Sequence, residues 1–213
     1  MGPRGIAEAD DLAEPDFLNM VLPAFNDPKV VLSYSQSKQI DATGNVVADD
    51  YLEYTSDVSP NHWLSPYSVD GTEEVASFLA IKNTIPNVSA VVFRRQAIAA
   101  VFDEALPDIL SHKIAGDWMA YVRILGSGRI AFRPEPLNLH RRHAGGVAIG
   151  SDQLPHLLEV LRMQKYVREH FQLDEATQDR ARRYAQKLYE YFGLATPERP
   201  RVELHDLAAP LLE

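Results

Sequence analysis

Apolar runs typical of strands alternate with segments of helical periodicity through the first two thirds of this chain. The strand-like runs are 30–35, 46–48, 88–93, 130–132 and 137–140. The helical segments are 15–26, 73–81, 96–106 and 116–125. Strands that alternate with helices indicate a layered architecture, because each element must bury its apolar face against another. The sequence therefore predicts an α/β fold with a mixed sheet flanked by helices.

Beyond Gly150 the pattern changes to two amphipathic segments, 153–171 and 175–192. Their apolar faces predict two helices that pack as a hairpin. We therefore divide the chain into an α/β part, 1–150, and a helical extension, 151–213. Tyr and Leu side chains on these helices make them a candidate homo-oligomer interface.

Composition excludes several classes of protein. The formal net charge of -9 argues against a nucleic-acid-binding protein, which would carry a basic domain or stripe. The chain has no cysteine, so it has neither disulfides nor thiolate metal sites, and a cytoplasmic location is the simplest expectation. No apolar run reaches the ~20 residues of a membrane span, so we do not expect a transmembrane segment. A peripheral association with a membrane surface is the alternative to a purely cytoplasmic location. The Met1-Gly2 start and the Leu212-Glu213 end suggest an excised domain.

Three carboxylates, Glu8, Asp10 and Asp11, follow an apolar step near the start of the chain. One interpretation is an acidic first turn of a helix, where carboxylates are favoured. The other is a Mg²⁺ or Mn²⁺ site, because hard divalent cations prefer carboxylate and phosphate oxygens. The residues alone leave both interpretations open.

Asp117 and Trp118 open a predicted helix. Asp117 is either a helix cap or a general base that removes a proton from an attacking hydroxyl. Trp118 is either a core residue or a wall of the same site.

A strand end runs into a basic, glycine-containing loop at residues 139–146. It is either a basic surface turn or a site where Arg141 or Arg142 meets phosphate and an imidazole completes a metal site. His140 and His143 are three residues apart, so on an extended segment they face opposite sides and one of them points into a site.

Four segments together resemble family 2 glycosyltransferases of the GT-A fold. They are Glu8-Ala9-Asp10-Asp11 with Pro15 after it, Asn87 to Arg95, Gly116-Asp117-Trp118 and Arg141-Arg142-His143. The resemblance covers roughly residues 6–148 and corresponds to the second, acceptor-binding half of such an enzyme. It implies a partial GT-A-like sheet and transfer of a sugar, with inversion, from a nucleoside-diphosphate-sugar donor to a hydroxyl acceptor such as a glycan.

The resemblance also implies roles for individual residues. Glu8 and Asp10 stand at the family's Asp-x-Asp motif, with Asp10 as the metal ligand and Glu in place of the first Asp. Asp117 matches the catalytic base. His143 matches a histidine near the metal or diphosphate, and Arg141, Arg142 and Asp11 belong to the same donor side. The acceptor side would hold Trp118, Asn87 and Ser89, with Trp63 in a long ordered loop, 49–72, that also carries Tyr51, Tyr54 and Tyr67.

The family's nucleotide-binding half would precede Ile6, so we expect this chain alone to be inactive. Two other functions stay open at this point. One is a non-catalytic carbohydrate-binding or assembly module, in which the carboxylates are incidental. The other is a metal-dependent phosphohydrolase with Asp10, Asp11 and His143 as ligands.

Overall fold

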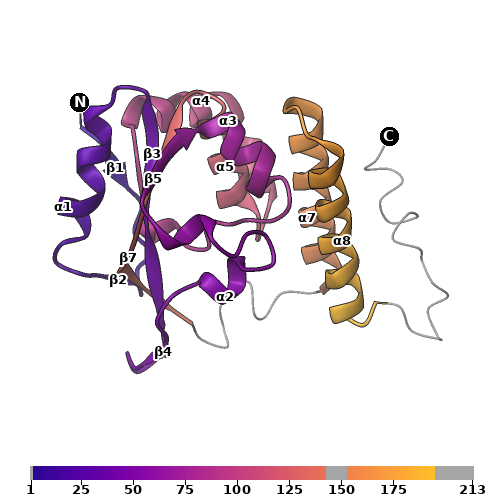
Figure 1. The fold of residues 1–213 in the computed structure, drawn as a ribbon, viewed down its shortest axis with the longest axis horizontal. Coiled ribbons are helices and arrows are strands. Elements are labelled where there is room, and N and C mark those ends of the chain that lie inside the picture. The colour runs from indigo at the N-terminus through magenta and orange to yellow at the C-terminus, as the bar shows by residue number, and fades with distance from the viewer. Residues whose placement is uncertain (1, 143–152, 195–213) are drawn as a thin grey trace.

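The fold is a mixed α/β layer structure with a helical hairpin at one end (Figure 1). A computed structural model describes residues 2–142 and 153–194. Within these ranges, seven strands form one sheet in the order β1-β6-β3-β7-β2, with β4 paired to β3 and β5 paired to β7. The strands are β1 (Arg4–Gly5), β2 (Leu12–Ala13), β3 (Val30–Ile40), β4 (Val46–Ala48), β5 (Tyr67–Asp70), β6 (Val91–Phe93) and β7 (Arg129–Arg141).

Strands β3 and β7 are parallel, and the other pairs are antiparallel. The helices are α1 (Phe17–Val21), α2 (Leu52–Thr55), α3 (Gly71–Glu74), α4 (Arg95–Ser111), α5 (Gly116–Leu125), α7 (Gln153–His170) and α8 (Glu175–Tyr191). Short 3₁₀ turns cover Leu22–Asn26, His62–Leu64 and Val88–Ala90, and a π turn, Val75–Leu79, extends α3. This arrangement confirms the predicted mixed α/β fold.

The sheet is covered on both faces, as strand β6 illustrates. Val91 and Phe93 enter the main core, whereas Val92 packs against Phe17 and Val21 of α1. Successive side chains of a strand point to opposite faces, so the three residues of β6 contact different layers. The continuously apolar run of this strand follows from burial on both sides.

Several predicted elements are confirmed, and others differ for identifiable reasons. Strand β3 continues to Ile40, and 130–132 and 137–140 belong to the single strand β7, because these two strands pair along their length. The predicted strand 88–93 is wrong for its first half. There the Asn87 side chain accepts a hydrogen bond from the Ser89 backbone N–H at 2.6 Å and stabilises a turn.

The predicted loop 49–72 is not irregular throughout, because it contains α2, a 3₁₀ turn and β5. The helix predicted to end near residue 106 continues to Ser111 despite Pro107. Ala105 and Ile109 of this helix are buried in the main core, so packing favours its continuation.

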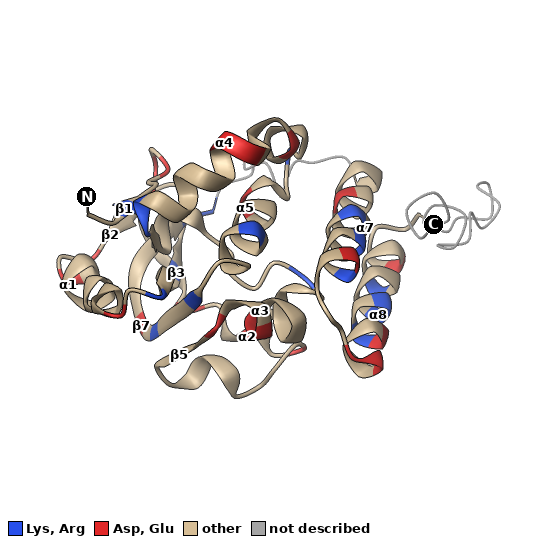
Figure 2. Ribbon diagram, turned by 90° about the horizontal axis from the view of Figure 1, so that it is seen from above, with Lys and Arg blue, Asp and Glu red and all other residues tan. Residues whose placement is uncertain are grey.

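The two late helices match their predicted bounds closely and lie side by side (Figure 1). Figure 2 shows Lys and Arg interspersed with Asp and Glu along both helices. Their apolar sides are buried. Leu157, Leu161, Ala185 and Tyr189 form a core within the hairpin, whereas Val160, Met163 and Val167 enter the main core. The hairpin therefore packs directly against the α/β part.

In the part of the chain that the structure describes, each helix is too short or too polar to cross a membrane.

Candidate active site

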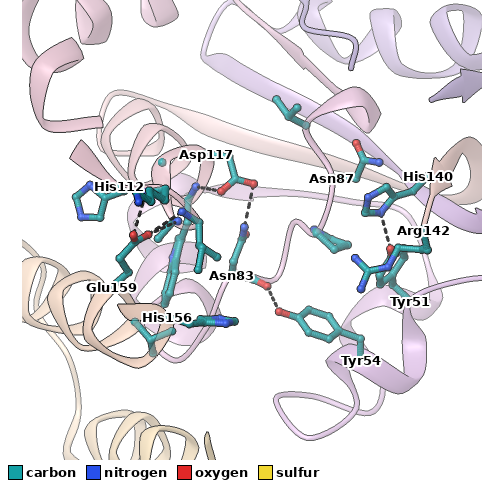
Figure 3. Close-up of a pocket in the computed structure, with 18 of the residues that line it drawn as sticks. Tyr51, Tyr54, Asn83, Asn87, His112, Asp117, His140, Arg142, His156 and Glu159 are labelled. Atoms are coloured by element: carbon teal, nitrogen blue, oxygen red, sulfur yellow. Dashed lines mark hydrogen bonds between the residues drawn. The ribbon is translucent and has the colours of Figure 1, made fainter. Parts of the chain in front are cut away.

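A cleft of about 930 Å³ lies between the α/β part and the helical hairpin (Figure 3). Its lining comes from the acidic segment 8–11, the segment 83–88, the start of α5, the end of β7, and α7 and α8. The cleft brings together most of the predicted site residues, namely Glu8, Asp10, Asp11, Asn87, Asp117, Trp118, Arg141 and Arg142. Trp63 and Ser89 do not line it, and His143 is outside the described residues.

Two of the four residues that we predicted on the acceptor side hold the acidic segment in place. The Ser89 hydroxyl accepts a hydrogen bond from the Glu8 backbone N–H at 2.9 Å. The Asn87 amide donates to the Asp11 carboxylate at 2.8 Å, and the Arg141 backbone N–H donates to its other oxygen at 2.8 Å. Asn87 and Ser89 therefore position the acidic segment.

Glu8, Asp11 and His140 form a group in which one ligand atom from each lies within 4.8 Å of the others. Two carboxylates and an imidazole are donors that fit Mn²⁺ or Mg²⁺. This group differs from the predicted ligands: it contains Asp11 rather than Asp10, and the histidine is His140 rather than His143. Each Asp11 oxygen accepts one hydrogen bond but keeps a lone pair for a cation.

The protonation state of His140 favours metal binding at neutral pH. Burial lowers the pKa of His140, and the Arg142 charge adds to this effect, whereas the Asp11 and Asp10 carboxylates oppose it. The imidazole is therefore neutral, which is the form that binds a cation. Its Nδ1 is hydrogen-bonded to the Tyr51 hydroxyl, which orients the ring. Partial burial raises the pKa of Glu8, and the Asp11 and Asp10 charges raise it further.

The two arginines at the end of β7 have different roles. The Arg141 guanidinium donates to the backbone carbonyls of Asp10 and Asp41, each at 2.8 Å. These hydrogen bonds hold the acidic segment in place. The Arg141 guanidinium therefore contacts backbone carbonyls rather than making the contact with phosphate that we predicted. Arg142 lies beside Tyr51 and His140 in the cleft (Figure 3), where its guanidinium can meet an anion.

Asp117 sits in the first turn of α5, as the sequence predicted, and its carboxylate faces the cleft. One oxygen accepts from the Trp118 backbone N–H at 2.7 Å, and the other accepts from the Asn83 amide at 3.2 Å. Burial raises the pKa of Asp117 to about 6, and the Glu8 charge adds to this effect. A carboxylate with such a pKa is ionised at neutral pH and is a stronger base than an exposed aspartate.

The tryptophans are structural to different degrees. Trp118 is 2% exposed, and its indole N–H donates to the Leu79 carbonyl at 3.0 Å. The small accessible part of its side chain lines the cleft. Trp63 is 3% exposed and donates to the Tyr34 hydroxyl at 2.9 Å inside the main core. The prediction that Trp63 offers an acceptor surface is therefore wrong. An aromatic residue in a loop-like stretch of sequence gives no sign of whether the loop folds inward.

Other aromatic side chains do line the cleft. Tyr51 and Tyr54 come from the 49–72 segment, and the Tyr54 hydroxyl donates to the Asn83 carbonyl at 2.9 Å. The hairpin contributes a second aromatic wall, which no local pattern in the sequence indicated. It consists of His156, Tyr184, Tyr191 and Phe192, with Tyr191 84% exposed.

No protein-family model matches this sequence, and a comparison with curated proteins finds no match. The chemistry of the cleft is therefore the basis for assigning a function.

Proposed function

We propose that this cleft is the catalytic centre of an inverting, metal-dependent glycosyltransferase of the family 2, GT-A type. It would transfer a sugar from a nucleoside-diphosphate-sugar donor to a hydroxyl acceptor. One observation carries the proposal. The same cleft holds three candidate ligands for a divalent cation, Glu8, Asp11 and His140. It also holds a separate carboxylate, Asp117, whose pKa of about 6 suits a general base.

Two sets of residues in the cleft suit the two substrates. A divalent cation bound at Glu8, Asp11 and His140 would neutralise the negative charge of the departing diphosphate. Arg142, beside the same group, supplies a guanidinium for phosphate oxygens. The aromatic side chains of Tyr54, Tyr184 and Tyr191 supply apolar faces on which a sugar ring can stack.

The reaction needs one proton acceptor at the acceptor hydroxyl. Asp117 takes the hydroxyl proton while the hydroxyl oxygen bonds to the anomeric carbon and the bond from that carbon to the diphosphate oxygen breaks. Attack from the face opposite the leaving group inverts the anomeric configuration. The Trp118 N–H and the Asn83 amide hold the two Asp117 oxygens, so the carboxylate is preorganised for this step.

Product analysis tests this function. The protein that carries this chain is incubated with Mn²⁺, a panel of nucleoside-diphosphate sugars and glycan acceptors, and the products are analysed by mass spectrometry and NMR. We expect a new glycoside of inverted configuration with release of nucleoside diphosphate. Free phosphate or hydrolysed nucleotide without a glycoside would instead indicate a phosphohydrolase, and binding of glycans without turnover would indicate a non-catalytic module.

The matched variants are Asp117→Asn and Asp103→Asn. Asp117→Asn removes the base with little change in shape, and we expect transfer to fall by at least about 100-fold. Asp103 is exposed on α4, outside the cleft, and its substitution should leave transfer unchanged. Equal rates for the two variants would contradict the role assigned to Asp117.

A further inference from the structure

Glu159 of α7 reaches from the helical hairpin into the loop that precedes α5. One of its oxygens accepts a hydrogen bond from the Lys113 backbone N–H at 2.9 Å. The other accepts from the backbone N–H groups of Ile114 at 2.8 Å and Ala115 at 2.9 Å. The residue is only 6% exposed, and Figure 3 shows its carboxylate directed at this loop.

These contacts immobilise the start of the helix that carries Asp117. Ala115 is the residue just before α5, and Asp117 follows it by two positions. The three N–H groups belong to the N-cap residue Ala115 and to the two residues before it, and hydrogen bonds to an ionised acceptor are the strong ones. Burial raises the pKa of Glu159, but the three backbone N–H groups and His112 outweigh it, so the pKa is lowered and the carboxylate is ionised at neutral pH.

We propose that Glu159 is a positioning residue for Asp117, so that the helical hairpin is a working part of the catalytic centre rather than an appendage. This inference rests on the function proposed above. The Glu159 carboxylate fixes the 113–115 loop, and the loop fixes where the Asp117 carboxylate stands in the cleft. His156 and Val160 of the same helix line that cleft, so the hairpin contributes both a wall and the anchor of the base.

The competing explanation is that Glu159 only fastens the hairpin to the α/β part. Gln164 provides a matched control for that role. It lies on the same helix, is 7% exposed, and its amide donates to the Ile81 carbonyl at 2.9 Å and the Ala181 carbonyl at 3.0 Å. Gln164 therefore anchors the hairpin as well, but it makes no hydrogen bond to the 113–115 loop.

The experiment compares Glu159→Gln, Glu159→Ala and Gln164→Ala in the protein that carries this chain. Glu159→Gln keeps the shape and one acceptor oxygen, so it stays folded if the alanine variant does not. Three quantities are measured: kcat and the donor KM for glycosyl transfer, hydrogen exchange of the 113–115 amides, and the NMR titration of the Asp117 carboxyl.

We expect Glu159→Gln to lower kcat by roughly tenfold to 100-fold with an unchanged donor KM, since small displacements of a reacting group have effects of this size. The 113–115 amides should exchange faster, and the Asp117 titration midpoint should fall as water reaches the loosened site. Gln164→Ala should leave all three quantities close to those of the wild type.

Two results would overturn the inference. The first is faster exchange of the 113–115 amides in Glu159→Gln with an unchanged kcat. The second is an equal fall of kcat in Glu159→Gln and Gln164→Ala, which would reduce Glu159 to an anchor. If the wild-type protein transfers no sugar, the proposed function is wrong. The Asp117 titration then tests whether Glu159 positions Asp117. A midpoint that moves only in the Glu159 variants supports this role, and an unmoved midpoint refutes it.

Discussion

Asp117 is ionised at neutral pH in a place that disfavours its charge. Its folded-state pKa of about 6 lies above the ordinary 3.8, so between these pH values the folded protein binds the proton more tightly than the unfolded chain. Stability from this group is therefore present at low pH and is lost as pH rises through about 6. The loss is about 3 kcal/mol by linkage.

Replacement of Asp117 by Asn should consequently stabilise the fold at neutral pH. The amide removes the buried charge but gives up the hydrogen bond from Asn83, worth about 1 kcal/mol. We expect urea unfolding at pH 7.5 to show a gain of about 1–2 kcal/mol for Asp117→Asn. At pH 4 the gain should vanish, because the wild-type carboxyl is already protonated there. A variant that is less stable than the wild type at pH 7.5 would contradict the raised pKa.

The same pKa predicts the pH dependence of transfer. A base must be deprotonated to accept the hydroxyl proton, so kcat/KM should rise with pH along a limb centred near 6 and then level off. The measurement is a pH profile with saturating Mn²⁺. A limb centred near 4 would mean that a more exposed carboxylate serves as the base.

The start of α3 lies against the turn between α5 and β7. The Gly71 backbone N–H donates to the Gly128 carbonyl at 2.9 Å, and a Cβ at Gly71 would lie 2.2 Å from the Leu125 carbonyl oxygen. This distance is far below contact distance, and backbone cannot yield as a flexible side chain does. Only glycine therefore fits at this crossing.

Gly71→Ala should lower the free energy of unfolding by about 3 kcal/mol, because the backbone must move apart. Gly126→Ala is the matched control in the same turn. Gly126 has helical backbone angles, and the nearest atom to an added Cβ is the Arg123 carbonyl oxygen at 3.4 Å. We expect thermal unfolding to show a change of less than about 1 kcal/mol for this control. Similar losses for both variants would argue against the close crossing.

Local sequence signals predicted some elements well and others poorly. The hairpin helices follow from their apolar periodicity and from a local cap, since Asp174 accepts from the Thr177 backbone N–H at 2.6 Å. The start of α5, and with it Asp117, was predicted from apolar periodicity alone, because its N-cap residue Ala115 makes no side-chain cap hydrogen bond. Strand β5 was missed because only its pairing with β7, about 60 residues away in sequence, stabilises it.

The candidate cation group shows the same limit. Asp11 and the end of β7 are brought together by a hydrogen bond between residues 130 positions apart. No local pattern indicates which of two adjacent aspartates, or which of two nearby histidines, will face such a partner. The sequence therefore predicted the kind of site and its segments, but the individual ligands depend on tertiary contacts.

For the whole molecule, the hairpin and the α/β part share one core. Met163 of α7 is fully buried in the same cluster as Leu32 of β3 and Trp118 of α5. We expect the two parts to unfold together. Both tryptophans lie in the α/β part, so tryptophan fluorescence follows that part, whereas much of the helical circular dichroism comes from α7 and α8.

Met163→Ala should lower the free energy of unfolding by about 2–5 kcal/mol, the cost of a large-to-small change in a core. The fluorescence and circular-dichroism transitions should shift together. Arg162→Ala, one residue away on the exposed side of α7, should change stability by less than about 0.5 kcal/mol. If the dichroism transition moved while the fluorescence transition stayed in place, the hairpin would be an independent unit.

The proposed function requires a metal-dependent diphosphate site at Glu8, Asp11 and His140, which calorimetric titration with uridine, guanosine and thymidine diphosphates can detect. Each is titrated with and without Mn²⁺ into the wild type, Glu8→Gln and Asp10→Asn. We predict that binding requires Mn²⁺ and weakens at least about tenfold in Glu8→Gln, the loss of a charged ligand, but not in Asp10→Asn. Binding that is unaffected by Mn²⁺ and by Glu8→Gln would contradict the claim.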